Sequence, residues 1–327
     1  MDGLRVLKYD YKRRFGVEIE VNSLSGRDFI DYPLDKNELP DGIEYIGEKI
    51  VKNLKIPVIL HQWHPTHNNN NWVLKPDSSC GIEVCSPVDK GAYGLNQICN
   101  VVDLISSDKK ITIDDRCSFH LHVNLDDCSE TEITAILAWW VKCEAAFLDS
   151  LPASRKRSRY CQCIGISDVF YHDFIDYFAI NGALGKQKYY TINSFHMNKK
   201  KRKSIEFRPL GNEGCKSVEI AKNWIRLLIH FVEMAKNKSL PRPWVDGVSG
   251  INDPFRGLLW LDPKDVFRFL GFLDCELCKE LTEVRNWFLK RLKNNIKTDL
   301  LGMWSIQGRA KAIEEVDELI SHFKLDI

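Results

Sequence analysis

The stretch 116–124 constrains the fold most. It reads Arg-Cys-Ser-Phe-His-Leu-His-Val-Asn, so its apolar side chains alternate with His120, His122 and Asn124. Such alternation predicts a β-strand with one buried face and one polar face. Two imidazoles two positions apart then point the same way and can reach one metal ion or one phosphate. This spacing also occurs by chance on protein surfaces, so its meaning depends on whether other strands carry the same pattern.

A second alternating strand is predicted at 14–21, where Glu18 and Glu20 share the face opposite the apolar residues. Taken alone, this stretch is most simply interpreted as an edge strand whose polar side faces water. The functional interpretation is a pair of carboxylates beside a cation.

Two further segments show the same pattern. Residues 72–87 predict a β-hairpin with its turn at 77–81. The side chains expected on its polar face are Lys75, Asp77, Glu83 and Cys85. A strand at 189–195 is followed by one at 204–212, which places Glu206 and Arg208 on a common face.

Four strands thus carry ionisable groups on one face and apolar groups on the other. We expect an α+β fold, in which helices pack behind a curved antiparallel β-sheet whose concave face is charged. Carboxylates gathered on that face repel one another unless cations neutralise them. Oxygen ligands with a minority of imidazoles suit Mg²⁺ or Mn²⁺. Arginines beside divalent ions are the usual means of holding a triphosphate.

The rest of the chain predicts helices and loops. The helices are expected near 45–54, 92–106, 130–148 after a capping box at Ser129, 217–236, 262–270, 275–292 and 309–323. The run 154–161 has four basic residues in five and is interpreted as a solvated loop, a nucleic-acid patch or a polyphosphate contact. The histidines of 61–67 are interpreted as part of a solvated loop, because Pro65 and a run of asparagines interrupt any helix.

Composition excludes several classes of protein. A formal net charge of +1 gives no overall attraction to nucleic acid or to membranes. No apolar run is long enough to cross a bilayer, and the first residues lack the features of a signal peptide, so a cytoplasmic protein is expected. In that compartment the 11 cysteines are expected to be reduced and largely buried.

Five motifs occur in a distinctive order. They are Phe-Gly-Val-Glu-Ile-Glu; Trp-x-x-Lys-x-Asp-x-Ser with Glu-Val-x-Ser-Pro; Cys-x-Phe-His-x-His-Val; Ser-Arg-x-x-x-Arg-Tyr-Cys; and Ile-Glu-Phe-Arg. In this order they resemble the putative amidoligases of the glutamine synthetase and glutamate–cysteine ligase superfamily, over roughly residues 13–235. Ser78 and Ser118 depart from the usual pattern, which has Asp-Gly-Ser at the first place and a glycine before the aromatic residue at the second.

The resemblance implies a fold like the glutamine synthetase catalytic domain and an ATP-dependent carboxylate–amine ligase. Such an enzyme forms an amide or isopeptide bond through an acyl-phosphate and requires ATP and Mg²⁺ or Mn²⁺. The implied metal ligands are Glu18, Glu20, Asp77, Glu83, His120 and Glu206. The implied catalytic residues are Arg157, Arg159, Arg208 and Glu83, and the implied nucleotide contacts are His122, Lys75 and Lys203. Residues 1–240 would form the catalytic domain and 241–327 a helical C-terminal extension.

Two other functions use the same residues. A metal-dependent hydrolase or phosphotransferase could employ the acidic and histidine groups. A hydrolase, however, needs a metal-bound water but not a triphosphate clamp, and the arginines and lysines beside the expected metal ligands argue against it. An inactive binding module of the same fold is disfavoured because the motifs keep all their charged positions.

The expected partners are a small carboxylate, such as an amino acid or peptide, and an amine. Either substrate could be carried on a macromolecule that contacts 155–159 and 199–203. Their identities and the oligomeric state do not follow from the sequence.

Overall fold

The computed structural model describes most of the chain, including the segments expected to form the sheet. The residues described are 6–9, 12–22, 41–60, 70–156, 158–164, 189–194, 203–239, 260–296 and 306–326. They form a mixed α/β structure with a mostly antiparallel open sheet, which agrees with the expected α+β class. The histidines of 61–67 and the Pro-rich segment near 241 lie outside the described residues.

The chain divides into two compact units. The first, here the sheet unit, comprises Tyr11–Asn124 and Glu206–Ile225. The second, here the helical unit, comprises Met1–Asp10, Leu125–Ile205 and Arg226–Ile327. These units are defined by contacts, and a functional division at residue 240 stays a prediction.

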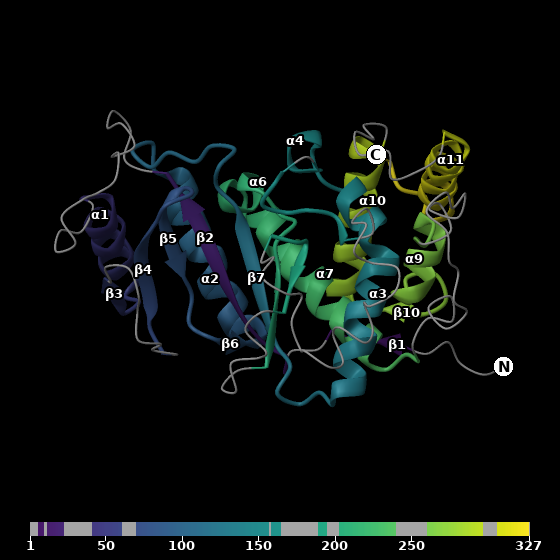
Figure 1. Cartoon of the computed structure of the whole chain (residues 1–327), viewed down its shortest axis with the longest axis horizontal. Coiled ribbons are helices and arrows are strands. Elements are labelled where there is room, and N and C mark those ends of the chain that lie inside the picture. Colours follow the sequence, from purple (N-terminus) through teal and green to yellow (C-terminus); the bar gives the residue numbers. More distant parts are fainter. Residues whose placement is uncertain are drawn as a thin grey trace. The chain divides into compact units, whose positions relative to one another are not determined.

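The strands of the sheet unit are ordered β3-β4-β5-β2-β7-β9 (Figure 1). Their bounds are β2 Arg14–Val21, β3 Val58–Leu60, β4 Trp72–Asp77, β5 Gly81–Cys85, β7 Phe119–Asn124 and β9 Ser204–Phe207, which enters the sheet unit at Glu206. The pairs β4–β5, β5–β2 and β2–β7 are antiparallel, whereas β3 runs parallel to β4. The short strand β6, Asp89–Lys90, pairs with the start of β2.

The position of β2 overturns the simplest interpretation of its sequence. This strand is hydrogen-bonded on both sides, to β5 and to β7, and is therefore central rather than an edge strand. Its apolar residues, such as Val17 and Ile19, are almost fully buried. On the opposite face Glu20 is only 6% exposed, so this face is not open to bulk water either.

Three of the described helices pack against strands of this sheet, namely α1 Asp41–Lys49, α2 Gly91–Ser107 and α6 Asn212–Lys216. The same unit contains the π-helix η1 Ile50–Leu54 and the first turns of α7 Val218–Lys236. Both α2 and α6 contact β2, and α6 also contacts β7. Gly214 permits this close approach, because a Cβ atom there would lie 2.8 Å from the Cβ of Phe119.

The helical unit has its own core. Its helices are α3 Glu130–Asp149, α4 Ala153–Lys156, most of α7, α9 Pro263–Phe269, α10 Lys279–Asn295 and α11 Ile306–His322. Its strands are β1 Val6–Leu7, which pairs in parallel with β10 Glu276–Leu277, and β8 Ile192–Asn193. The predicted capping box at Ser129 and Glu132 is confirmed, and Trp140, Phe147 and Phe231 form an aromatic cluster in the core.

Three sequence predictions about this region were wrong in detail. The basic run was interpreted as a solvated loop, a nucleic-acid patch or a polyphosphate contact, but two of its members, Arg155 and Lys156, lie on α4 and are buried, whereas Arg159 is exposed. Lys156 Nζ lies 2.9 Å from Asp149 Oδ1, and this ion pair compensates for its burial. The strand expected at 189–195 is limited to β8, and the strand expected at 204–212 ends at Phe207.

The described residues contain all 11 cysteines as thiols rather than as disulfides, and most of them are buried as expected. Among those residues, no helix is long and apolar enough to cross a membrane.

Candidate active site

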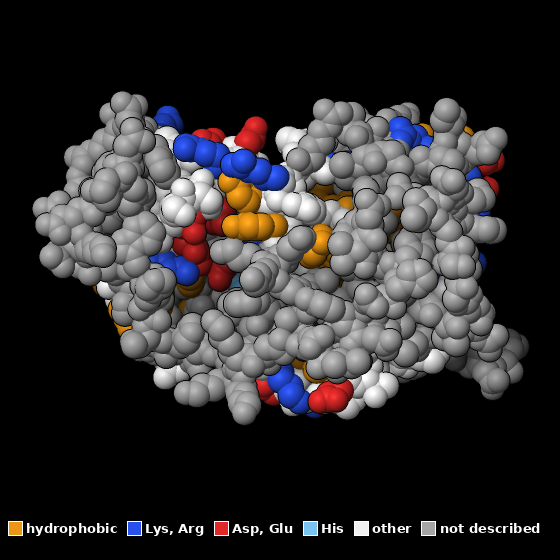
Figure 2. Space-filling model, in the orientation of Figure 1, with side chains coloured by type: hydrophobic (Ala, Val, Ile, Leu, Met, Phe, Trp, Pro, Cys, Tyr) orange, Lys and Arg blue, Asp and Glu red, His pale blue; other side chains and the backbone are white. Residues whose placement is uncertain are grey.

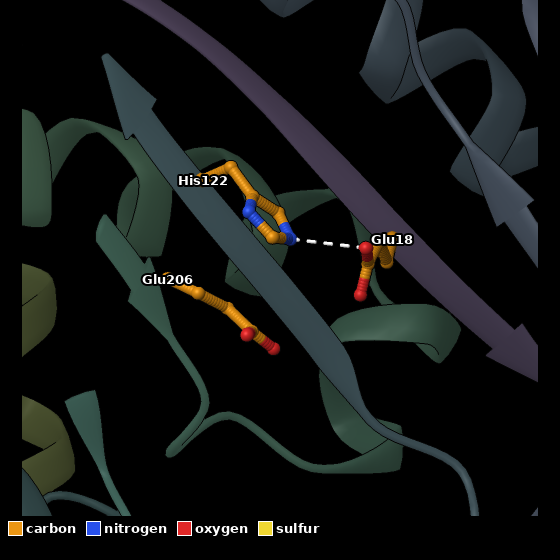
Figure 3. A group of neighbouring side chains, drawn as sticks. All are labelled: Glu18, His122 and Glu206. Carbon is orange, nitrogen blue, oxygen red and sulfur yellow. Dashed lines mark ion pairs between the residues drawn. The ribbon is translucent and has the colours of Figure 1, made fainter. Parts of the chain in front are cut away.

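Three neighbouring strands bring Glu18, His122 and Glu206 together (Figure 3). One ligand atom from each side chain lies within 4.8 Å of the other two. His122 Nε2 is 3.1 Å from Glu18 Oε1, and Figure 3 shows the carboxylate of Glu206 pointing into the same region from β9. Two carboxylates and an imidazole at this spacing can bind a divalent cation.

His120 lies directly behind this group and contacts both carboxylates. Its Nδ1 atom is 3.2 Å from Glu18 Oε2 and 3.3 Å from Glu206 Oε1. The side chain of His120 is almost fully buried. The antiparallel pairing of β2 with β7 places Glu18 directly opposite His120. On the other edge of the ring, Nε2 is 3.8 Å from Glu20 Oε1 and makes no hydrogen bond among the described residues.

The resemblance implied a metal ligand at His120 and a nucleotide contact at His122, and the structure places the two rings differently around the carboxylates. Ligand atoms of His122 belong to the three-residue group, whereas His120 bridges Glu18 and Glu206. No described contact tests a metal or nucleotide at either residue, so both roles stay predictions.

A second group of possible ligands shares Glu18. It consists of Glu18, Glu83 and Cys85, again with ligand atoms within 4.8 Å of one another. The Cys85 thiol donates to Glu83 Oε1 over 3.0 Å, and Lys75 Nζ lies 3.0 Å from the same oxygen. We expected Cys85 on the polar face but predicted no role for it. The register of β2 and β5 identifies Cys85 as part of this group, since it lies directly opposite Glu18.

The remaining acidic residues extend this face along β2, β4 and β5. Glu20 lies opposite Glu83 in the strand register. Asp77 stands where the β4–β5 hairpin turns, and its Oδ1 accepts from the backbone N–H of Ser79 at 2.7 Å and of Cys80 at 3.3 Å. Asp77 thus stabilises the turn as well as adding negative charge beside Glu20.

Arg208 supplies positive charge next to Glu206. Its guanidinium donates to Glu206 Oε1, and both side chains are largely shielded from solvent. The prediction that these two side chains lie on one face is confirmed, although β9 ends just before Arg208.

The charges of Glu18 and His122 support each other. Burial opposes ionisation of both, but their mutual attraction outweighs it. His122 and His120 hold the pKa of Glu18 well below its usual range. Despite burial, Glu18 and then Glu206 raise the pKa of His122 to about 9. In the metal-free protein at neutral pH, His122 is therefore an imidazolium beside a carboxylate.

The other buried groups respond to burial and to their nearest charges. Burial and the neighbouring Asp77 and Glu83 raise the pKa of Glu20 to about 8. Burial and Glu18 raise the pKa of Glu83 to about 7, although Lys75 opposes this. Burial also opposes ionisation of Glu206, but Arg208 and the histidines lower its pKa. The face thus holds carboxylates that lack sufficient positive charge, an arrangement that favours binding of an additional cation.

In Figure 2, acidic side chains in red and lysine or arginine side chains in blue lie close together in the part of the view where Figure 1 draws the strands of the sheet unit. The other residues expected to contact phosphate belong to segments of the sequence outside the sheet unit. Arg159 is exposed and donates to the Tyr160 hydroxyl at 2.7 Å, and Lys203 Nζ is 3.4 Å from the Cys128 carbonyl oxygen. Both belong to the helical unit, and Arg157 lies outside the described residues.

Comparison with known families agrees with the motifs. Residues 11–167 match the family model described as putative amidoligase enzyme. This segment carries β2, β4, β5 and β7, which supply most of the acidic and histidine side chains described above. Over this segment the match agrees with the resemblance drawn from the motifs, and its description points to a ligase-type enzyme. A comparison with curated proteins finds no match.

Proposed function

We propose that this protein is a Mg²⁺-dependent ligase that uses ATP to join a carboxylate to an amine through an acyl-phosphate. The observation that carries the proposal is the convergence of Glu18, His122 and Glu206, with Arg208 paired to Glu206. The family match over the strands of this site supports it. We also propose that the fold is like the glutamine synthetase catalytic domain, which the central, mostly antiparallel sheet supports.

The donor set fits a hard divalent cation. Carboxylate oxygens predominate, a minority of ligands are imidazoles, and the buried carboxylate of Glu20 lies 3.8 Å from Nε2 of His120. We propose that Glu18, Glu206 and a histidine, His122 or His120, hold one ion. Glu20, Asp77 and Glu83 are the proposed ligands of a second. Bound Mg²⁺ or Mn²⁺ would neutralise charge on the phosphoryl oxygens during transfer.

The chain's own residues would then act as follows. Arg208 is already oriented by Glu206, and its guanidinium would donate to the transferred phosphoryl group. Lys75, Lys203, Arg157 and Arg159 are proposed to contact phosphate, as arginine and lysine do in other phosphoryl-transfer sites.

The reaction requires two displacements. A carboxylate oxygen attacks the γ-phosphorus of ATP, the bond to the β-phosphate oxygen breaks, and ADP leaves. The amine nitrogen then attacks the acyl carbon, the carbon–oxygen bond breaks, and phosphate leaves. Glu83 is the proposed base that accepts the proton of the attacking amine, because it is a carboxylate on the same face with a pKa of about 7, raised by burial and by Glu18.

A hydrolase or phosphotransferase remains the second candidate, since the same acidic and histidine groups could hold a metal ion and a water. The pairing of Arg208 with Glu206 favours the ligase over the hydrolase, because a guanidinium next to the proposed metal ligands suits a transferred phosphoryl group. We further propose a cytoplasmic location, a small carboxylate such as an amino acid or peptide as the acid, and either a free or a macromolecule-borne amine.

Thermal unfolding with ATP and Mg²⁺ tests the nucleotide and metal requirement. We expect the two together to raise the melting temperature more than either alone, since ligands that bind only the folded state stabilise it. The matched control is ATP with EDTA. An equal shift in EDTA would contradict metal-dependent nucleotide binding.

A further inference from the structure

Lys75 lies inside the acidic face rather than at its margin. It stands on β4 directly opposite Glu83 on β5, and its Nζ atom is 3.0 Å from Glu83 Oε1. The two side chains are 23% and 8% exposed, so the pair is largely shielded from water. Burial opposes the charge of Lys75, but Glu83, Cys85 and Glu18 outweigh it and raise its pKa. The ammonium group is therefore held by the same residues that form the second group of possible metal ligands.

The position of this ammonium group overlaps that of a bound metal ion. Glu83 Oε1 accepts from Lys75 and from the Cys85 thiol, each at 3.0 Å. Glu83 and Cys85 also offer ligand atoms within 4.8 Å of Glu18. A divalent ion at this oxygen would meet the positive charge of Lys75 at close range, and like charges at that distance repel strongly.

We propose that Lys75 is an internal cation that competes with a divalent ion for Glu83. In the metal-free protein its ammonium group neutralises Glu83, and an ion reaches Glu83 only when the ammonium group moves away. The inference rests on the proposed function to the extent that a divalent ion binds this acidic face.

The competition has a signature that a purely structural lysine would not give. Removing the ammonium group leaves Glu18, Glu20 and Glu83 close together with less positive charge, so the metal-free protein becomes less stable. The same change removes the competing cation, so a divalent ion binds more tightly. A residue that only supports the fold would weaken both properties when it is replaced.

Calorimetric titration with Mn²⁺, in the absence of nucleotide, tests this inference. We expect Lys75→Met to bind Mn²⁺ about tenfold more tightly than the wild type, which equals about 1.4 kcal/mol at 25 °C. Lys75→Arg keeps the charge and should stay within about twofold of the wild type. Lys90→Met, on the exposed Lys90 of β6, is the matched control and should not change the affinity.

Two further measurements separate the possible failures. In a Glu83→Gln background, Lys75→Met should no longer tighten Mn²⁺ binding, because the shared carboxylate is gone. Lys75→Gln provides the same test should Lys75→Met fail to fold. Binding of Mn²⁺ to the wild type with no tightening in the neutral Lys75 variants would overturn this inference alone. No Mn²⁺ binding by any of these proteins would overturn the proposed metal site as well.

Discussion

Glu18→Gln is the substitution whose effect the structure defines most sharply. Oε1 of Glu18 lies 3.1 Å from Nε2 of His122. Burial lowers the pKa of His122, and Glu18 contributes most to raising it to about 9. With a neutral glutamine in its place, burial is opposed mainly by the weaker influence of Glu206. We expect the pKa of His122 to fall to its ordinary value of 6.5 or below.

The size of this effect follows from the two pKa values. Each pKa unit corresponds to 1.36 kcal/mol, so the difference between about 9 and 6.5 represents about 3 kcal/mol. Because the pKa in the folded protein exceeds that in the unfolded chain, this stabilisation is fully present below about pH 6.5 and is lost as the pH rises through about 9. Glu20 and Glu83 also have raised pKa values, and their ionisation destabilises the fold progressively from about pH 4.5 to about 8 and about 7.

Nuclear magnetic resonance titration of the His122 ring, in metal-free protein, measures the pKa of this group without those overlapping contributions. His122→Gln assigns the signal, and Glu219→Gln, on the exposed Glu219 of α7, is the charge-matched control. If the pKa of His122 stays near 9 in Glu18→Gln but the protein remains folded, the proposed coupling between these two residues is refuted.

Three other predictions address metal binding and catalysis. A divalent ion bound by His122 must displace the proton of its ring, so the affinity for Mn²⁺ should rise with pH up to about 9. Calorimetry in buffers of different ionisation enthalpy detects the released proton. An affinity that does not depend on pH would argue against His122 as a ligand. Glu206→Gln leaves Arg208 without its carboxylate, so the metal-free protein should lose about 1–3 kcal/mol of unfolding free energy and its stabilisation by Mg²⁺ and ATP. Retention of both in denaturant and thermal unfolding would remove Glu206 from the site. Arg159→Ala should lower ADP release while changing the unfolding free energy by less than about 0.5 kcal/mol, because Arg159 is exposed; full activity would exclude its proposed phosphate contact.

The sequence predicted the strands of the site well because their alternation is local. The segments 14–21 and 119–124 each place apolar and polar residues on opposite faces, and both became strands in which the apolar residues are buried. The hairpin turn near Asp77 was also predictable, because Asp and Gly favour such turns and Asp77 accepts hydrogen bonds within it.

The register and the order of the strands could not be predicted from local sequence patterns. That Glu18 lies opposite both His120 and Cys85 depends on pairing between distant segments, and this pairing decides which side chains meet. The central position of β2 has the same origin.

The burial of Lys156 in the basic run could not be predicted for a related reason. Charged residues usually remain in water, and only a partner such as Asp149 makes the burial of Lys156 favourable. Nothing in the local sequence shows that Asp149 and Lys156 face each other.

The fate of a carboxylate oxygen tests the ligase proposal most directly. The protein would be incubated with ATP, Mg²⁺, pooled amines, and amino acids and peptides whose carboxylates carry oxygen-18, and both phosphate and products would be examined by mass spectrometry. We expect ADP, an amide product, and phosphate that contains an oxygen-18 atom, because that oxygen leaves the acyl carbon together with the phosphoryl group. Release of phosphate without label and without an amide product would contradict the ligase proposal and favour the hydrolase.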